Sequence, residues 1–95
     1  MEKRVVITGI GAVTPVGNDI PTTWESLLAG KNGIGKITKF DTSNSKVNIA
    51  AEVKGFDPLL YIEKSQARKM DLFTQYAMAA AAQAMQDSGI EGKVE

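Results

Sequence analysis

The chain has 95 residues, enough for one small domain with a single core. Eleven Lys and Arg balance eleven Asp and Glu, and 43% of the residues are hydrophobic, which excludes a disordered chain and any long-range attraction of the whole molecule to nucleic acid. The chain contains no Cys and no His, which excludes disulfides, thiolate nucleophiles and Cys-ligated metals and removes the commonest general base.

No segment is typical of a membrane span or a signal peptide. The apolar stretch at residues 77–82 is far shorter than the roughly 20 residues that a spanning helix needs. The apolar run at residues 5–10 is interrupted by Thr8 and Gly9, whereas a signal peptide has a longer hydrophobic region. We therefore expect a cytoplasmic protein without a membrane partner.

The first predicted element is a strand at residues 4–8, with the sequence RVVIT. Its apolar residues are consecutive, which is typical of a strand that is covered on both faces in a parallel sheet. A loop rich in turns is predicted to follow this strand, because it contains Gly9, Gly11, Pro15 and Gly17.

The next predicted element is a helix at residues 21–29, because Thr22 and Glu25 have the spacing of a capping box and Gly30 follows the last turn. Within this helix Trp24 is predicted to pack against a sheet. Residues 31–46 are predicted to form an ordered surface loop, and residues 47–53 a second strand.

Two helices are predicted in the last part of the chain. Asp57 and Pro58 indicate the start of a short helix at residues 59–63. Asp71 precedes a long helix at residues 72–88, which is rich in Ala and ends before Gly89. Small side chains allow close approach of neighbours, so we expect this helix to lie in an inner layer.

This order of elements predicts an α/β fold, formed by residues 1–95 as one segment without a second domain. A central strand needs a neighbour on each side to satisfy its backbone groups. The chain offers few strands, so the strand at residues 4–8 is expected to lack a partner. An isolated chain would therefore be marginally stable or associate with itself.

Gly9 and Gly11 follow the first strand, and a Gly-x-Gly step also begins the dinucleotide-binding fingerprint. The third glycine of that fingerprint is replaced by Thr14, and Pro15 follows where the phosphate-binding helix should run. We therefore interpret the two glycines as structural residues that adopt a positive φ or allow close backbone packing.

Lys64, Arg68 and Lys69 form the only tight group of basic residues. Lys64 and Arg68 are four residues apart and would share a helix face, where they could pair with phosphates or carboxylates. A solvated helix start is the alternative interpretation. The carboxylates are dispersed along the chain, so no metal ion and no cofactor are expected.

Four segments together resemble the start of the β-ketoacyl-acyl-carrier-protein synthase family. They are RVVITGIGAVTPVGN from residue 4, PTTWESLLAGKNGI from residue 21, KFD at residues 39–41, and ARKMDLFTQYAMAAAAQAMQDSGI from residue 67. The resemblance covers nearly the whole chain, and the closest form is the type II synthase that elongates longer acyl chains. It implies the amino-terminal part of a thiolase-like fold with α-β-α-β-α layers, incomplete in this chain.

The resemblance also implies a function: elongation of fatty acyl chains by decarboxylative Claisen condensation of an acyl-enzyme with malonyl-acyl-carrier-protein. A Cys nucleophile and two His perform this chemistry in the family, and all three lie beyond the matching region, so no catalytic residue is expected in this chain. The implied partners are acyl carrier protein in its acyl- and malonyl-loaded forms and, in the complete protein, a second subunit.

The resemblance further implies that Arg68 and Lys69, with Lys64 one turn earlier, help to dock the acidic carrier protein. Two alternatives remain open for the chain as a whole. One is a fragment of a polyketide ketosynthase, and the other is an independent small binding domain.

Overall fold

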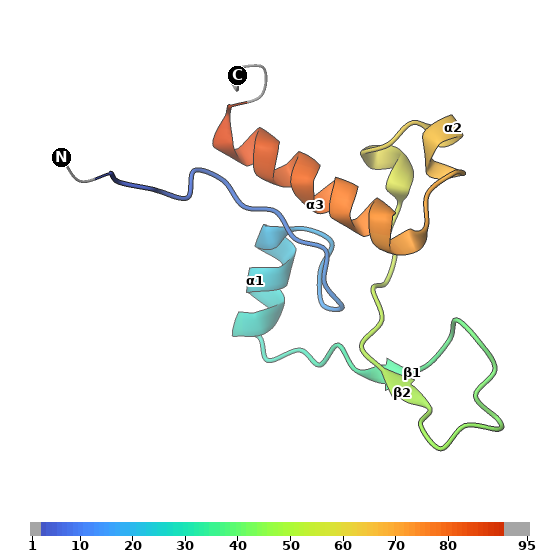
Figure 1. The fold of residues 1–95 in the computed structure, drawn as a ribbon. Helices are drawn as coiled ribbons and strands as arrows, with labels where there is room; N and C mark the ends of the chain where they lie inside the picture. Colours follow the sequence, from blue (N-terminus) through green and yellow to red (C-terminus); the bar gives the residue numbers. More distant parts are fainter. Residues whose placement is uncertain (1–2, 91–95) are drawn as a thin grey trace. The chain divides into compact units, whose positions relative to one another are not determined.

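The computed structural model describes residues 3–90 (Figure 1). The described residues divide into two compact units, one formed by residues 3–12 and 57–90 and the other by Val13–Phe56. The helices and strands in chain order are α1 (Ile20–Leu28), β1 (Gly35–Lys36), β2 (Ile49–Ala50), the 3-10 helix η1 (Pro58–Leu60), α2 (Lys64–Ala67) and α3 (Leu72–Ser88).

Helix α3 dominates the first unit and has the predicted bounds (Figure 1). Asp71 occupies the N-cap position, but its side chain makes no capping hydrogen bond. Gly89 ends the helix with a φ of 69°, a left-handed conformation that glycine adopts without the steric cost of a Cβ atom. The Gly signal therefore predicted the end of this helix correctly.

The predicted strand at residues 4–8 is not formed, because no other described segment pairs with it. The chain instead continues irregularly along α3. The Ile10 N–H donates to the Asp87 carboxylate at 3.0 Å, and the Ala12 N–H donates to Gln83 Oε1 at 3.0 Å. Asp87 and Gln83 are one helical turn apart, about 6 Å, which matches the spacing of alternate residues in an extended chain.

Gly9 and Gly11 make this close approach to α3 feasible. A Cβ atom at Gly9 would lie 2.5 Å from the carbonyl oxygen of Ala84, and one at Gly11 would overlap with the backbone of Ala80. Neither glycine has a positive φ. Of the two structural roles that the sequence suggested, close backbone packing is therefore the correct one.

The predicted helix at residues 59–63 is a shorter 3-10 turn, η1. Asp57 caps it as expected, accepting the Leu59 N–H at 3.0 Å. The buried apolar side chains of this unit come from α2, from α3 and from the segment between η1 and α2. The buried hydrophobic residues of the described chain are Ile62, Ala67 and Ala79.

Helix α1 organises the second unit, but its cap differs from the predicted capping box. The carboxylate of Asp19 accepts the Thr22 N–H at 2.8 Å, so Asp19 is the N-cap and the helix begins one residue earlier than expected. At the other end the Lys31 N–H donates to the Ser26 carbonyl oxygen at 3.0 Å across Gly30, whose φ is 70°. This is the bonding pattern of a Schellman C-cap.

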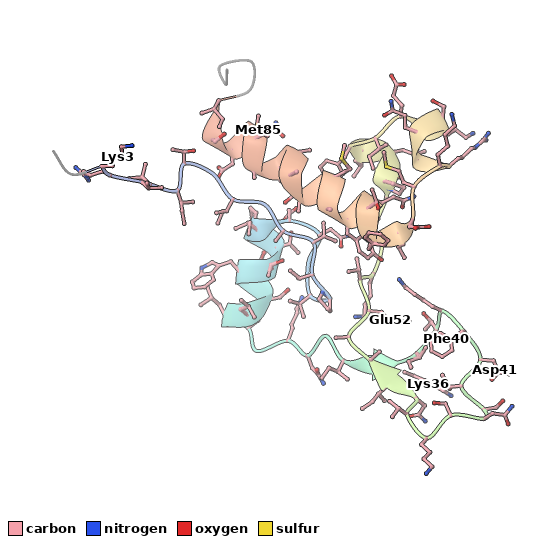
Figure 2. All side chains as sticks on the ribbon, viewed as in Figure 1. Lys3, Lys36, Phe40, Asp41, Glu52 and Met85 are labelled. Carbon is pink, nitrogen blue, oxygen red and sulfur yellow. The ribbon has the colours of Figure 1, made fainter. Side chains whose placement is uncertain are left out.

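The expected surface loop after α1 contains a strand. Residues Gly35–Lys36 pair antiparallel with Ile49–Ala50, so the predicted second strand is reduced to two residues. Phe40 and Asp41 lie on the long connecting loop (Figure 2). At its base the carboxylate of Glu52 accepts the Thr38 hydroxyl at 2.9 Å, which fixes the loop where it leaves the strand pair.

Much apolar surface is exposed in the described structure. Val5 is 95% exposed, Ile7 85% and Trp24 61%, so Trp24 is not the packing anchor that the sequence suggested. Along α3 only Ala79 is fully buried. Within residues 3–90 no further layers cover this helix, as its predicted position in an inner layer would require. The α/β composition is observed, but the layers of the predicted fold are not.

Gly11→Ala tests the close approach of the irregular segment to α3. Because the added Cβ would overlap with the backbone of Ala80, we expect the free energy of unfolding to fall by about 1–3 kcal/mol. Gly35→Ala is the matched control, since a Cβ there meets no atom within 4 Å. Urea titrations followed by circular dichroism measure both. Equal stability of the two variants would contradict the packing role.

The exposed segment at residues 4–8 should promote self-association of the 95-residue chain by strand pairing or element exchange. We expect sedimentation velocity to show assembly that increases with protein concentration. Val6→Pro removes a backbone donor and should reduce assembly, whereas Val6→Thr retains the donor and should not. A stable monomer with a cooperative melt for the unaltered chain would refute this prediction.

Candidate functional site

The three predicted docking residues, Lys64, Arg68 and Lys69, form a basic cluster around α2. The Arg68 N–H donates to the Lys64 carbonyl oxygen at 3.2 Å, so helical geometry continues to Arg68 and these two residues lie one turn apart on one side. Lys69 follows in a tighter turn, with its N–H bonded to the Gln66 carbonyl oxygen at 3.0 Å. The three residues are therefore neighbours along one helical turn and the turn that follows it.

The basic cluster is held by the buried side of α2. Ala67 is 7% exposed, and its carbonyl oxygen accepts a hydrogen bond of 3.0 Å from the side-chain amide of Gln75 on α3. The residues of the cluster are themselves exposed. Within residues 3–90 their side chains form no ion pair and no hydrogen bond, so their positive charges are available to a partner.

Two acidic residues flank the basic cluster in sequence. Glu63 is the N-cap residue of α2, where its side chain makes no capping bond, and Asp71 is the N-cap residue of α3. Three positive charges therefore lie between two negative ones, which gives residues 63–71 a net charge of +1. The field of the cluster is local, and its attraction to an anionic partner would be screened beyond about 10 Å at 0.1 M salt.

The Gly-x-Gly segment does not form a nucleotide site. Gly9 and Gly11 lie against the backbone of α3, and α1 begins only at Ile20, so no helix N-terminus follows the second glycine. The geometry that binds a pyrophosphate in the dinucleotide fold is therefore absent from the described residues.

Three acidic side chains, those of Asp19, Asp41 and Glu52, accept hydrogen bonds from backbone N–H groups close to them. The N–H of Thr22 lowers the pKa of the Asp19 carboxyl, and the N–H of Ser43 lowers that of Asp41. The hydroxyl of Thr38 has the same effect on the pKa of Glu52. Among the described residues no group of three or more carboxylates could hold a metal ion.

The structure reveals one cavity that sequence reasoning missed. It has a volume of about 530 Å³, lies within the second unit, and is lined by residues before α1 and after it, together with Lys54. The ammonium group of Lys54 donates to three backbone carbonyl oxygens. Neither apolar periodicity nor a motif marks Lys54, because two of the three carbonyls, those of Pro15 and Gly33, belong to residues that are far from Lys54 in the sequence.

Residues 2–94 match the family model described as beta-ketoacyl synthase, N-terminal domain. The chain belongs to the beta-ketoacyl synthase family. The resemblance inferred from the sequence is therefore confirmed over nearly its whole length.

Curated relatives agree with this assignment. The chain is 53% identical over 89 residues to 3-oxoacyl-[acyl-carrier-protein] synthase 2 of Staphylococcus aureus strain COL, covering 94% of this chain and 22% of the relative. It is 53% identical over 92 residues to the protein of the same name from Coxiella burnetii, and the match covers 96% of this chain and 22% of that relative. The chain thus spans about 22% of the length of these relatives.

A solved structure described as the ishigamide ketosynthase/chain length factor is also similar to this beta-ketoacyl synthase chain. The TM-score is 0.85 at 37% sequence identity, and the match covers 94% of this chain and 22% of that one. The fold of this chain is therefore similar to part of that solved structure. Within residues 3–90, no helix has both the length and the apolar character required to cross a bilayer.

Proposed function

We propose that this chain is the amino-terminal part of a type II 3-oxoacyl-acyl-carrier-protein synthase, which elongates fatty acyl chains by decarboxylative condensation. The match of residues 2–94 to the family model carries the proposal. The 53% identity to proteins named 3-oxoacyl-[acyl-carrier-protein] synthase 2 supports the fatty acid enzyme in particular.

In such an enzyme these residues would contribute scaffold rather than chemistry. A Cys thiolate would accept the acyl group and release the carrier thiol, and the carbanion left by loss of CO₂ from malonyl-carrier-protein would displace the thiolate. The chain has no Cys and no His, so these groups would come from other parts of the complete protein. Four further expectations stay predictions. They are the α-β-α-β-α layers, the homodimer, the single-segment assignment of residues 1–95 and the cytoplasmic location.

A polyketide ketosynthase is the second candidate, because the ishigamide ketosynthase/chain length factor structure matches with a TM-score of 0.85. Its identity of 37% is lower than the 53% shared with the synthase 2 proteins. The fatty acid enzyme is therefore the better supported of the two.

Activity measurements test the proposed function. The complete protein that contains these residues should consume malonyl-carrier-protein, release CO₂ and lengthen a saturated acyl-carrier-protein by two carbons. The 95-residue chain should give no product under the same conditions, because it lacks a nucleophile. Condensation by the isolated chain, or its absence in the complete protein, would refute the proposal.

The basic cluster is proposed as part of the surface that docks acyl carrier protein. Its three cationic side chains are exposed, and α2 holds them together through the buried Ala67. Charge complementarity to an acidic carrier would increase the rate of encounter and orient the partner. If these residues are only a solvated helix start, carrier binding should not depend on their charge.

Reversing Arg68 and Lys69 to Glu in the complete protein should weaken carrier-protein binding about tenfold at low salt and lower its salt dependence. Surface plasmon resonance over a range of salt concentrations measures both effects. The control reverses Lys36 and Lys46, which are exposed residues of the other unit and carry the same charge. Equal affinity of the two double variants at low salt would exclude the docking role.

A further inference from the structure

Lys54 is the point at which three segments of the second unit meet. Its Nζ donates to the carbonyl oxygens of Glu52 at 2.8 Å, Gly33 at 3.0 Å and Pro15 at 3.2 Å. An ammonium group has three N–H donors and no acceptor, so the three carbonyls satisfy it completely. Hydrogen bonds from a charged donor are about twice as strong as those between neutral groups.

No carboxylate balances this charge among the described residues. The Glu52 carboxylate is occupied by Thr38, and the Asp19 carboxylate, which lines the same cavity, caps α1. Within residues 3–90, the groups that accept hydrogen bonds from the Lys54 ammonium are therefore backbone carbonyl oxygens. Rings of carbonyl oxygens are also the means by which proteins replace the hydration shell of a free cation.

The segments that supply the carbonyls are themselves closely packed. A Cβ at Gly33 would lie 2.8 Å from the Pro15 side chain, and the amide of Asn18 donates to the Lys54 carbonyl oxygen at 3.0 Å. Thr14 and Gly17 next to Pro15 form an isolated bridge with hydrogen bonds of 2.8 and 3.3 Å. The carbonyl group of Pro15 is thus held in place within a tight turn.

We propose that the carbonyl oxygens of Pro15, Gly33 and Glu52 form a site for a monovalent cation bearing N–H donors, and that Lys54 fills it as a tethered ammonium ion. Lys54 is then a positioning residue that holds the turn at residues 14–17 against the segments around Gly33 and Glu52. Because Lys54 is exposed as a whole, solvent cations can enter the site when its side chain is shortened.

Lys54→Ala tests this proposal through hydrogen exchange of the Thr14 and Gly17 amides in the full chain, measured by NMR. We expect both amides to exchange about tenfold faster in the variant, because the bonds that hold their turn are lost. Lys54→Met retains most of the aliphatic side chain without the donors and should behave like Lys54→Ala. Lys46→Ala removes an equal charge from an exposed position of the same unit and should change neither amide.

The effect of added cations on amide exchange in Lys54→Ala tests whether the three carbonyl oxygens form a cation site. Methylammonium chloride should slow exchange in Lys54→Ala toward that of the unaltered chain, whereas tetramethylammonium chloride, which has the same charge and no N–H donor, should not. If Lys54→Ala unfolds, methylammonium should restore the Gly17 amide signal, so the experiment stays decisive. Normal protection in Lys54→Met, or equal recovery with both salts, would overturn the proposal.

Discussion

The close approach of residues 9–12 to α3 is the contact on which the first unit depends. Gly9 and Gly11 lack the Cβ atoms that would collide with the helix backbone, so the two segments can touch along their main chains. Two polar residues of α3, Gln83 and Asp87, then accept the backbone N–H groups of Ala12 and Ile10. The helix thereby takes over part of the role that a neighbouring strand would have in a sheet. Gln83 also donates to the Tyr61 hydroxyl at 3.2 Å, which connects the same contact to the segment after η1.

The second unit is held mainly by polar contacts to its backbone. Ser26, the buried residue of α1, donates its hydroxyl to the Val16 carbonyl oxygen at 2.7 Å, and Lys54 joins three further carbonyls. Such contacts fix geometry but remove little apolar area from water, and apolar burial is the main favourable term in folding. This explains why the unit is well connected although Trp24 and Leu28 remain exposed.

The basic cluster and the Lys54 site illustrate two uses of a lysine or arginine charge. In the cluster the side chains extend from a small helix into solvent, where complementary charge on a partner can reach them. At Lys54 the charge is directed inward and is satisfied by the protein's own carbonyl groups. The two positions differ in the partners of their charges: three carbonyl oxygens accept from Lys54, whereas the side chains of the basic cluster make no hydrogen bond within residues 3–90.

Local signals in the sequence were sufficient for α3, from the residue after Asp71 to the turn at Gly89, and for the caps at Asp57 and the end of α1, because these depend on neighbouring residues. The family was also recognisable from sequence, since its motifs are contiguous. The small number of strands already predicted that residues 4–8 would lack a partner, but only the tertiary structure showed that this segment forms no strand and that the chain after it lies along α3. It likewise decided between the two roles of Gly9 and Gly11, and it brought Pro15, Gly33 and Glu52 together around Lys54. These are contacts between distant segments, and no local pattern encodes them.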